Sequence, residues 1–193
     1  MKIVIVPMGM LEAGAVAVAQ NCVRRLFASE VYSVEPIACP PNSHDARRNQ
    51  YSSVAFMLAL ARGAFGDADR VIGLTGCDLF IPMLTFVFGQ AQLHGRVALV
   101  SLARLRQEFY GADPDRGFLE LRLSKEIGHE LGHSFGLVHC PDRKCLMSLA
   151  TSIQDVDAKA DDFCPSCRSL LAREIAVSNE GTHESEMADS GRR

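Results

Sequence analysis

The sequence predicts an α/β (α+β) fold, in which helices cover a mixed, mostly parallel sheet. Three observations lead to this prediction. Short runs rich in β-branched residues alternate with longer helical segments in the N-terminal part of the chain. A long helical segment then carries two histidines four positions apart. After Gly136 turns and cysteines replace strands, which indicates a small C-terminal lobe.

The first elements are predicted in the order strand, helix, strand. Residues 2–6 form an apolar, β-branched run, as expected of a strand buried on both faces. Residues 13–28 are rich in helix formers and place their larger apolar side chains on one face, which predicts an amphipathic helix. Residues 31–37 are predicted as the second strand.

The next segments continue this alternation. Asp45 is a candidate N-cap for a helix over residues 46–62, because a side-chain oxygen at that position can accept a hydrogen bond from the first turn. Residues 70–75 and 97–102 are predicted as two further strands of the sheet.

Residues 84–88 are predicted as an antiparallel strand at the edge of the sheet. The interval from residue 76 to residue 92 is short and contains no helical segment, so a parallel crossover does not fit there. A free edge can bind an extended peptide as an added strand. We therefore expect Phe86, Val87 and Phe88 to bind substrate.

The rest of the chain is predicted to form the candidate active-site helix over residues 118–135, then the small lobe. On this reading, residues 1–135 are a lobe of sheet and helices, and residues 136–177 are the C-terminal lobe. The last helix is expected at residues 166–177. Residues 178–193 are polar and poor in large apolar groups, so a disordered tail is expected.

Composition and charge exclude several classes of function. The formal net charge is −3 with acidic and basic residues mixed, so neither nucleic acid nor an anionic membrane is an expected partner. Residues 1–19 resemble a short signal peptide. Pro7, Gly9 and Glu12 interrupt the apolar run, however, so we favour a first strand, a turn and a first helix for these residues. An odd total of seven cysteines then favours reduced thiols in the cytoplasm.

The main functional motif is His129-Glu130-Leu131-Gly132-His133, followed by His139. Histidines at positions i and i+4 lie on one helix face and can bind one metal ion. Gly136 can end the helix and turn the chain back, so that His139 approaches the same ion. Three protein ligands leave a position for water, as in catalytic zinc sites, and Glu130 is the candidate general base.

Four cysteines suggest a second metal ion. Cys140, Cys145, Cys164 and Cys167 fall into two close pairs, which suits a tetrahedral structural zinc site. Two disulfides or four free thiols are the alternatives. We favour zinc because residues 136–177 are too few and too polar to fold around a core of their own.

The pattern from His129 to Cys167 resembles the archaemetzincins, a group of metzincin zinc metallopeptidases. The long histidine motif matches that of the metzincins, and Met147 stands where they have the methionine of the Met-turn. The resemblance extends, less specifically, to Phe86-Val87-Phe88-Gly89 and to Arg48-Asn49-Gln50-Tyr51. It implies a zincin-like fold, one catalytic and one structural zinc ion per chain, and aminopeptidase or endopeptidase activity.

The expected function is therefore hydrolysis of peptide bonds in a peptide or protein substrate, through a zinc-bound water with Glu130 as general base. An aminopeptidase would also need an acidic group for the α-amine of the substrate, and Glu126 and Asp142 are candidates. The alternatives are a non-catalytic, zinc-stabilised module that binds peptides or proteins, and a nucleic-acid-binding module built on the cysteines. Nothing in the sequence indicates an oligomeric state.

Overall fold

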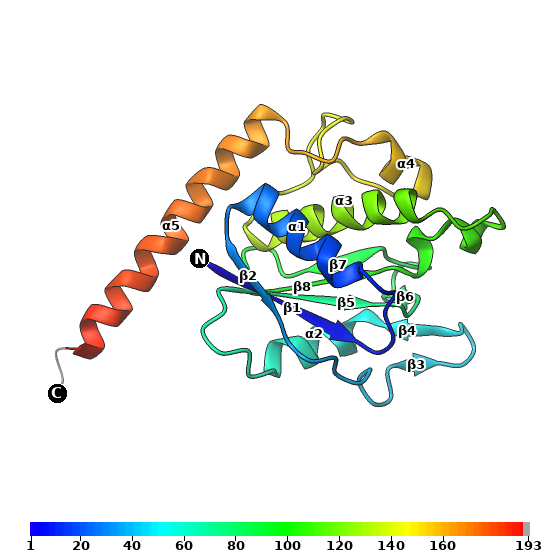
Figure 1. Cartoon of the computed structure of the whole chain (residues 1–193), viewed down its shortest axis with the longest axis horizontal. Coiled ribbons are helices and arrows are strands. Elements are labelled where there is room, and N and C mark those ends of the chain that lie inside the picture. Colours follow the sequence, from blue (N-terminus) through cyan, green and yellow to red (C-terminus); the bar gives the residue numbers. More distant parts are fainter. Residues whose placement is uncertain (191–193) are drawn as a thin grey trace.

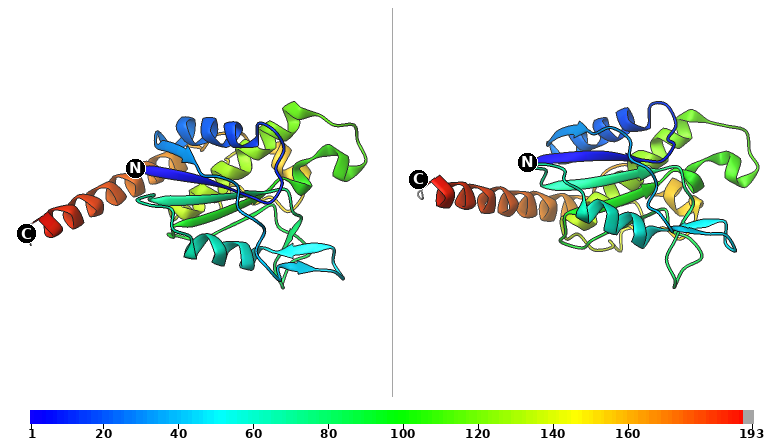
Figure 2. Two further views of the ribbon diagram at one scale, coloured as in Figure 1. Left: turned by 60° about the horizontal axis from the view of Figure 1, so that its bottom comes forward. Right: turned by 90° about the horizontal axis from the view of Figure 1, so that it is seen from below.

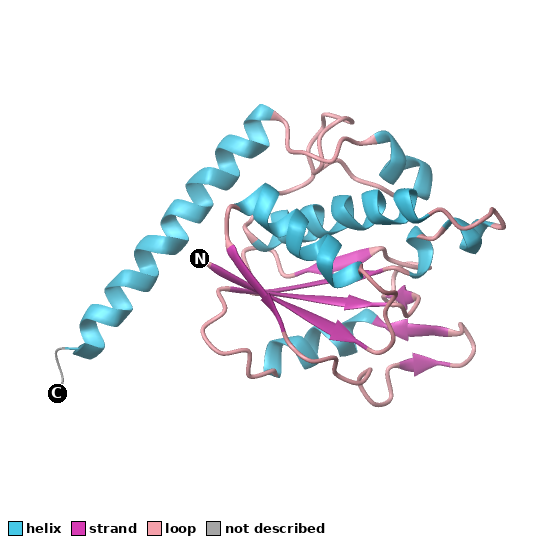
Figure 3. Cartoon of the chain, in the orientation of Figure 1, coloured by secondary structure: helices cyan, strands magenta, loops and turns pink. Residues whose placement is uncertain are grey.

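A computed structural model describes the backbone of residues 1–190 and the side chains of residues 1–178. Its centre is a five-stranded sheet with the strand order β2-β1-β5-β8-β7 (Figure 3). Four strands are parallel, and they are β1 (Lys2–Met8), β2 (Glu30–Ser33), β5 (Arg70–Thr75) and β8 (Val97–Ser101). The edge strand β7 (Gly89–Ala91) is antiparallel to β8. The predicted mixed, mostly parallel sheet is confirmed.

Helices cover both faces of this sheet (Figures 1 and 2). Helices α1 (Ala15–Phe27) and α3 (Arg116–Ser134) lie on one face, and α2 (Ser53–Arg62) lies on the other. In β1, Ile3 and Ile5 pack towards α1 and α3, whereas Val4 and Val6 pack towards α2. Both faces are buried, which explains why the strand sequence is apolar throughout.

A second, small sheet has the strand order β3-β4-β6. Its strands are β3 (His44–Asp45), β4 (Gln50–Ser52) and β6 (Leu79–Phe80). The helix predicted over residues 46–62 was therefore wrong at its start, because α2 begins at Ser53. The carboxylate of Asp45 accepts hydrogen bonds from the backbone of Arg47 and Arg48, so it closes a turn between β3 and β4 instead of capping a helix.

The predicted edge strand over residues 84–88 was also wrong in its bounds. The strand that pairs with β8 is Gly89–Ala91, in the expected antiparallel direction. Most of residues 81–88 form turns or bends, and Val87 makes an isolated antiparallel bridge to Leu79. That bridge directs residues 84–87 towards the small sheet, whereas the Phe88 carbonyl oxygen still accepts a hydrogen bond from the Ser101 N–H of β8 at 2.8 Å.

Residues 136–178 follow α3, and their helix α4 (Ile153–Ala158), which was not predicted, packs against α3. They also include the start of α5 (Pro165–Ser190). Two short 3₁₀ helices, Ala103–Leu105 and Gln107–Tyr110, connect β8 to α3. Leu146, Val156 and Phe163 are buried in the same core as α1 and α3. The proposed lobe boundary at residue 135 falls where α3 ends, and it stays a prediction.

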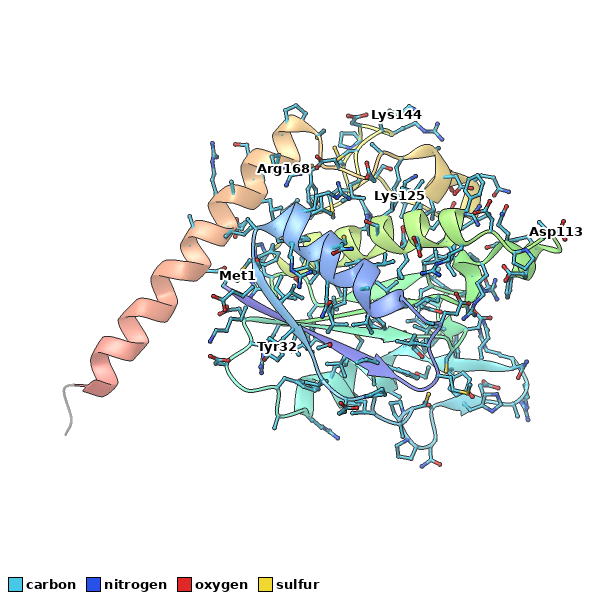
Figure 4. All side chains as sticks on the ribbon, in the orientation of Figure 1. Met1, Tyr32, Asp113, Lys125, Lys144 and Arg168 are labelled. Atoms are coloured by element: carbon cyan, nitrogen blue, oxygen red, sulfur yellow. The ribbon has the colours of Figure 1, made fainter. Side chains whose placement is uncertain are left out.

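Polar side chains also join this segment to the helices beneath it (Figure 4). Lys125 Nζ donates hydrogen bonds to the carbonyl oxygens of Val156 and Asp157, both at 3.0 Å. Arg168 donates to the carbonyl oxygen of Leu26 at the end of α1, at 2.8 Å. The C-terminal segment is therefore attached to both helices that cover this face of the sheet.

Helix α5 projects away from the rest of the chain (Figure 1). A disordered tail was expected over residues 178–193, whereas the backbone continues as helix to Ser190. Glu, the residue with good helix propensity that recurs in this stretch, is compatible with a helix even without a packed core. Residues 191–193 lie outside the described residues. Within residues 1–190, no helix is both long and apolar enough to cross a membrane.

Candidate functional site

Helix α3 carries the histidine motif, and both of its ends are well defined. The Asp115 carboxylate caps the first turn by accepting a hydrogen bond from the Phe118 backbone at 2.9 Å. At the other end Gly136 has φ +91°, and its N–H donates to the carbonyl oxygen of His133 at 2.8 Å. The Leu137 N–H donates to the carbonyl oxygen of Gly132 at 3.0 Å, which completes a Schellman motif. This turn sends the chain back towards His139.

The structure brings His129, His133 and His139 together, as the sequence predicts. One ring nitrogen of each lies within 4.8 Å of the others, and the Nε2 atoms of His129 and His133 are 3.1 Å apart. The Nδ1 atoms of these two histidines lie 3.0 Å from the carbonyl oxygen of Leu146 and 2.7 Å from that of Leu137. A carbonyl accepts only from a protonated Nδ1, so each Nε2 keeps its lone pair for a metal ion.

The electrostatics of the three histidines favour metal binding. Burial lowers the pKa of His129 well below its usual value, and burial is also the main cause of the lower pKa values of His133 and His139. The ammonium group of Lys159 lowers all three pKa values further. The imidazoles therefore stay neutral at pH 7, and neutral imidazole is the form that binds zinc.

Glu130 lies beside these rings, but its carboxylate is not among the converging atoms that could bind the metal ion. Its side chain is buried, and burial raises the pKa of its carboxyl group well above the usual range, with a further contribution from Glu126. A Cβ atom placed on Gly89 would lie 2.6 Å from Glu130 Cγ. The glycine in β7 therefore makes room for the Glu130 side chain against the edge of the sheet.

Met147 packs against the histidine motif at Gly132. It is fully buried, and a Cβ atom placed on Gly132 would lie only 2.5 Å from its Sδ atom. The central glycine of the histidine motif therefore lets the helix approach the methionine closely. The Met147 carbonyl oxygen accepts a hydrogen bond from the Cys140 N–H at 2.9 Å, so the same turn also supports the residue next to His139.

The four cysteines form a second cluster whose Sγ atoms all lie within 4.8 Å of one another. The Sγ atoms of Cys140 and Cys164 are 3.8 Å apart, which matches the edge of a tetrahedron with Zn–S bonds of about 2.3 Å. Backbone N–H groups of Met147 and Cys164 point at Cys145 Sγ, at 3.4 and 3.3 Å. This donor set, with N–H groups aimed at sulfur, fits a closed structural zinc site.

A cleft of about 450 Å³ opens onto the histidines and Glu130. Residues 84–91 form one side of it, including Phe86, Val87 and Phe88, which were predicted to bind substrate. Residues 149–151 form part of the opposite side. Glu126 also lines the cleft, whereas Asp142, the other candidate for binding an α-amine, is exposed and is not among the lining residues.

Lys159 is a buried residue near the site that the sequence does not single out. Its side chain is fully buried, and its Nζ atom lies 2.7 Å from Glu126 Oε1. A lysine after a short acidic stretch gives no sequence signal of burial, since its partner lies more than thirty positions away.

Two further contacts involve His94, Cys39 and Cys77, for which the sequence predicts no functional role. The structure places the His94 ring against Gly136, and the His94 N–H donates to the carbonyl oxygen of His133 at 3.2 Å. The Sγ atoms of Cys39 and Cys77 lie 3.5 Å apart. Neither contact could be read from the sequence, because each joins segments that only the fold brings together.

Comparisons with known proteins agree with this geometry. The model of Peptidase family M54 matches residues 58–173. Among curated relatives, the archaemetzincin of Methanopyrus kandleri is 48% identical over 136 residues, which cover 70% of this chain and 74% of the relative. The archaemetzincin of Pyrococcus abyssi is 38% identical over 183 residues, which cover 91% of this chain and 97% of the relative.

Solved structures show the same similarity. The crystal structure of the archaemetzincin from Methanopyrus kandleri has a TM-score of 0.81 and 40% identity, and the match covers 91% of this chain and 96% of that one. The archaemetzincin from Archaeoglobus fulgidus, crystallised with malonate, has a TM-score of 0.77 and 33% identity, with 88% and 99% covered. A zinc-dependent peptidase from Methanocorpusculum labreanum has a TM-score of 0.78 and 30% identity, also with 88% and 99% covered.

Proposed function

This chain belongs to peptidase family M54, the archaemetzincins, and is thus a zinc metallopeptidase; from this premise we propose that Glu130 is the general base of its reaction. The observation that carries the proposal is the position of Glu130. Its carboxyl group is buried, lines the cleft, and lies next to three histidines whose ring nitrogens converge. A buried carboxyl with a raised pKa suits proton transfer near neutral pH.

His129, His133 and His139 would hold the catalytic zinc ion. When bound, zinc polarises the scissile carbonyl group and lowers the pKa of a water molecule towards about 7. The carbonyl oxygens of Leu146 and Leu137 keep two of the rings in the correct tautomer and orientation. With Met147 beneath the helix, this arrangement supports assignment to the metzincin type.

Glu130 accepts a proton from the attacking water and then donates it to the nitrogen of the leaving amine. Its carboxyl group is held against β7 by the close approach at Gly89, so it has little freedom to turn away from the cleft. Glu126 does not compete for this role, because Lys159 Nζ lies 2.7 Å from its carboxylate.

The peptide substrate would lie along β7, which is the edge of the five-stranded sheet and borders the cleft. An extended peptide can add to such an edge through backbone hydrogen bonds. Phe86, Val87 and Phe88 would contact its side chains, because they line the cleft just before this strand.

The four cysteines would hold a second, structural zinc ion, which gives two zinc ions per chain. The converging Sγ atoms and the N–H groups that point at Cys145 support this assignment. Thiolates that bind zinc require reducing conditions, in keeping with a cytoplasmic location.

The proposal is tested with Glu130→Gln, which keeps the shape of the side chain but removes its ability to accept a proton. We expect unchanged zinc content and a loss of peptide hydrolysis of about 10²–10⁴-fold, measured on a library of short peptides. Glu120→Gln, on the exposed first half of the same helix, is the matched control and should keep full activity. Full activity of Glu130→Gln would exclude Glu130 as the base.

A further inference from the structure

Gln50 is a buried polar residue that the reaction does not use. Its side chain is 5% exposed, and it lies at the start of β4 in the small sheet. The Nε2 atom donates hydrogen bonds to the carbonyl oxygen of Thr85 and to Asp78 Oδ2, both at 3.0 Å. Thr85 belongs to the cleft wall, which we define as residues 84–88. One amide group therefore links the small sheet to the cleft wall.

The neighbours of Gln50 contact the same wall. Arg48 Nη1 donates to the carbonyl oxygen of Leu84 at 3.4 Å, and its guanidinium group lies 4.6 Å from the ring centre of Phe80. The Val87 N–H donates to the carbonyl oxygen of Leu79, the residue that pairs with Tyr51 across the small sheet. Arg48, Gln50 and Leu79 therefore each connect the region of the small sheet to the cleft wall.

Asp78 connects Gln50 to the aromatic part of the wall. Its carboxylate accepts two hydrogen bonds from Arg104, at 2.7 and 2.9 Å, besides the one from Gln50. The Arg104 guanidinium group lies 4.2 Å from the ring centre of Phe86, a cation–π distance. The backbone of Thr85 and the ring of Phe86 thus depend on one network centred on Asp78.

The wall has little regular structure of its own. In residues 84–88, the backbone contacts with strands are the bridge of Val87 to Leu79 and the hydrogen bond that the Phe88 carbonyl oxygen accepts from the Ser101 N–H at 2.8 Å. A segment with few backbone hydrogen bonds keeps one conformation only where other groups hold it. The Gln50 and Arg104 side chains supply those contacts on the side of the wall away from the cleft.

We propose that Gln50, together with Arg104, is a positioning residue that fixes the cleft wall opposite the three histidines. The inference rests on the proposed function, because it assumes that a peptide side chain lies against this wall. Loss of Gln50 then weakens binding of ligands that touch the wall and leaves the metal site itself unchanged. The wall carries Leu84, Phe86 and Val87, so the ligands most affected are those with an apolar side chain.

The experiment compares two zinc-binding probes on the zinc-loaded full chain. Acetohydroxamate binds zinc without a side chain, whereas phenylalanine hydroxamate adds an aromatic ring that can reach the wall. In Gln50→Met we expect the affinity for phenylalanine hydroxamate to fall about 10-fold, as expected for a misplaced contact surface. The affinity for acetohydroxamate and the zinc content should stay within about two-fold of wild type.

Arg104→Met is the second variant, because it removes the other arm of the network and should show the same split between probes. Arg47→Gln is the matched control, since Arg47 is exposed in the same segment and contacts Asp45 through its backbone N–H. Equal affinities for both probes in wild type and both variants would overturn the inference, and so would parallel losses for both probes. If neither probe bound the zinc-loaded wild type, the proposed function would fail first, and the inference with it.

Discussion

At the scale of single residues, glycines decide how closely the parts of the site approach one another. Gly132 lets α3 contact Met147, Gly89 lets β7 contact Glu130, and Gly136 ends the helix with φ +91°. At each of the three positions a Cβ atom would lie under 3.0 Å from a side chain of the site or its surroundings. The compact geometry around the histidines therefore depends on positions that have no side chain.

Gly132→Ala tests this directly. The added Cβ would lie 2.5 Å from Met147 Sδ and 3.2 Å from its Cε, in a core with no free space. We expect the free energy of unfolding to fall by about 1–3 kcal/mol and the affinity for zinc to weaken, measured by urea denaturation and by zinc competition. The control is Gly117→Ala on the first turn of α3, where the nearest atom is the Asp115 carboxylate at 3.3 Å. Equal behaviour of the two variants would contradict the role of Gly132.

The histidines also predict how zinc binding depends on pH. Burial lowers their pKa values, so the imidazoles of the folded chain remain neutral below pH 6.5, where free histidine is already half protonated. Protons therefore compete with zinc for the imidazole nitrogens only below about pH 6.5. Zinc content after dialysis at a series of pH values should stay constant from pH 8 to about 6.5 and fall on further acidification. Release that begins above pH 7 would contradict the prediction.

At the scale of secondary structure, α3 is held by buried charged groups as well as by apolar packing. Arg122 makes two hydrogen bonds of 2.7 Å to Asp157, and Lys125 donates to carbonyl oxygens of α4. The pair of Glu126 and Lys159 is almost fully buried. These contacts set the distance between the active-site helix and α4.

Lys159→Met tests the contribution of the buried pair. Removal of the ammonium group leaves the Glu126 charge buried without its partner, and breaking such a pair costs about 3–5 kcal/mol. We expect that loss in the free energy of unfolding, measured by urea denaturation of the zinc-loaded protein. The double variant Glu126→Gln with Lys159→Met should recover much of it, because no lone charge remains. A double variant as unstable as the single one would show that packing of the lysine stem, not its charge, matters.

At the scale of the whole molecule, the cysteine cluster ties the turn that carries Met147 to the start of α5. Cys145 lies two residues before Met147, and Cys164 and Cys167 lie at the beginning of α5. Cys140 follows His139 directly. A metal ion held by these four thiolates would therefore support both Met147 and His139.

Cys164→Ser is expected to remove the structural zinc and to lower the melting temperature, because a structural zinc contributes directly to folding. The affinity of the histidine site should weaken as well, since the support next to His139 is lost. Zinc content per chain should fall from two to one or less, measured by atomic absorption, whereas His133→Ala should lose only the other ion. Cys22→Ser, at a buried thiol that belongs to neither cluster, is the control. Two zinc ions in Cys164→Ser would exclude the cluster as a metal site.

The sequence by itself determined the features that depend on local spacing. Two histidines four apart share a helix face, a glycine three residues later permits the reversal, and two pairs of cysteines match a tetrahedral site. Buried strands at residues 2–6 and 70–75 were also evident, because burial on both faces leaves an unbroken apolar run. These patterns depend on local spacing, so they can be recognised without knowledge of the fold.

Only the tertiary structure decided the features that join distant segments. The edge strand moved to Gly89–Ala91 because the bridge from Val87 to Leu79 draws residues 84–87 towards the small sheet. The pair of Glu126 and Lys159 and the links from Gln50 to Thr85 and Asp78 connect residues 28–35 positions apart. Such contacts leave no periodic signal in the sequence, because each depends on how strands, turns and helices pack in three dimensions.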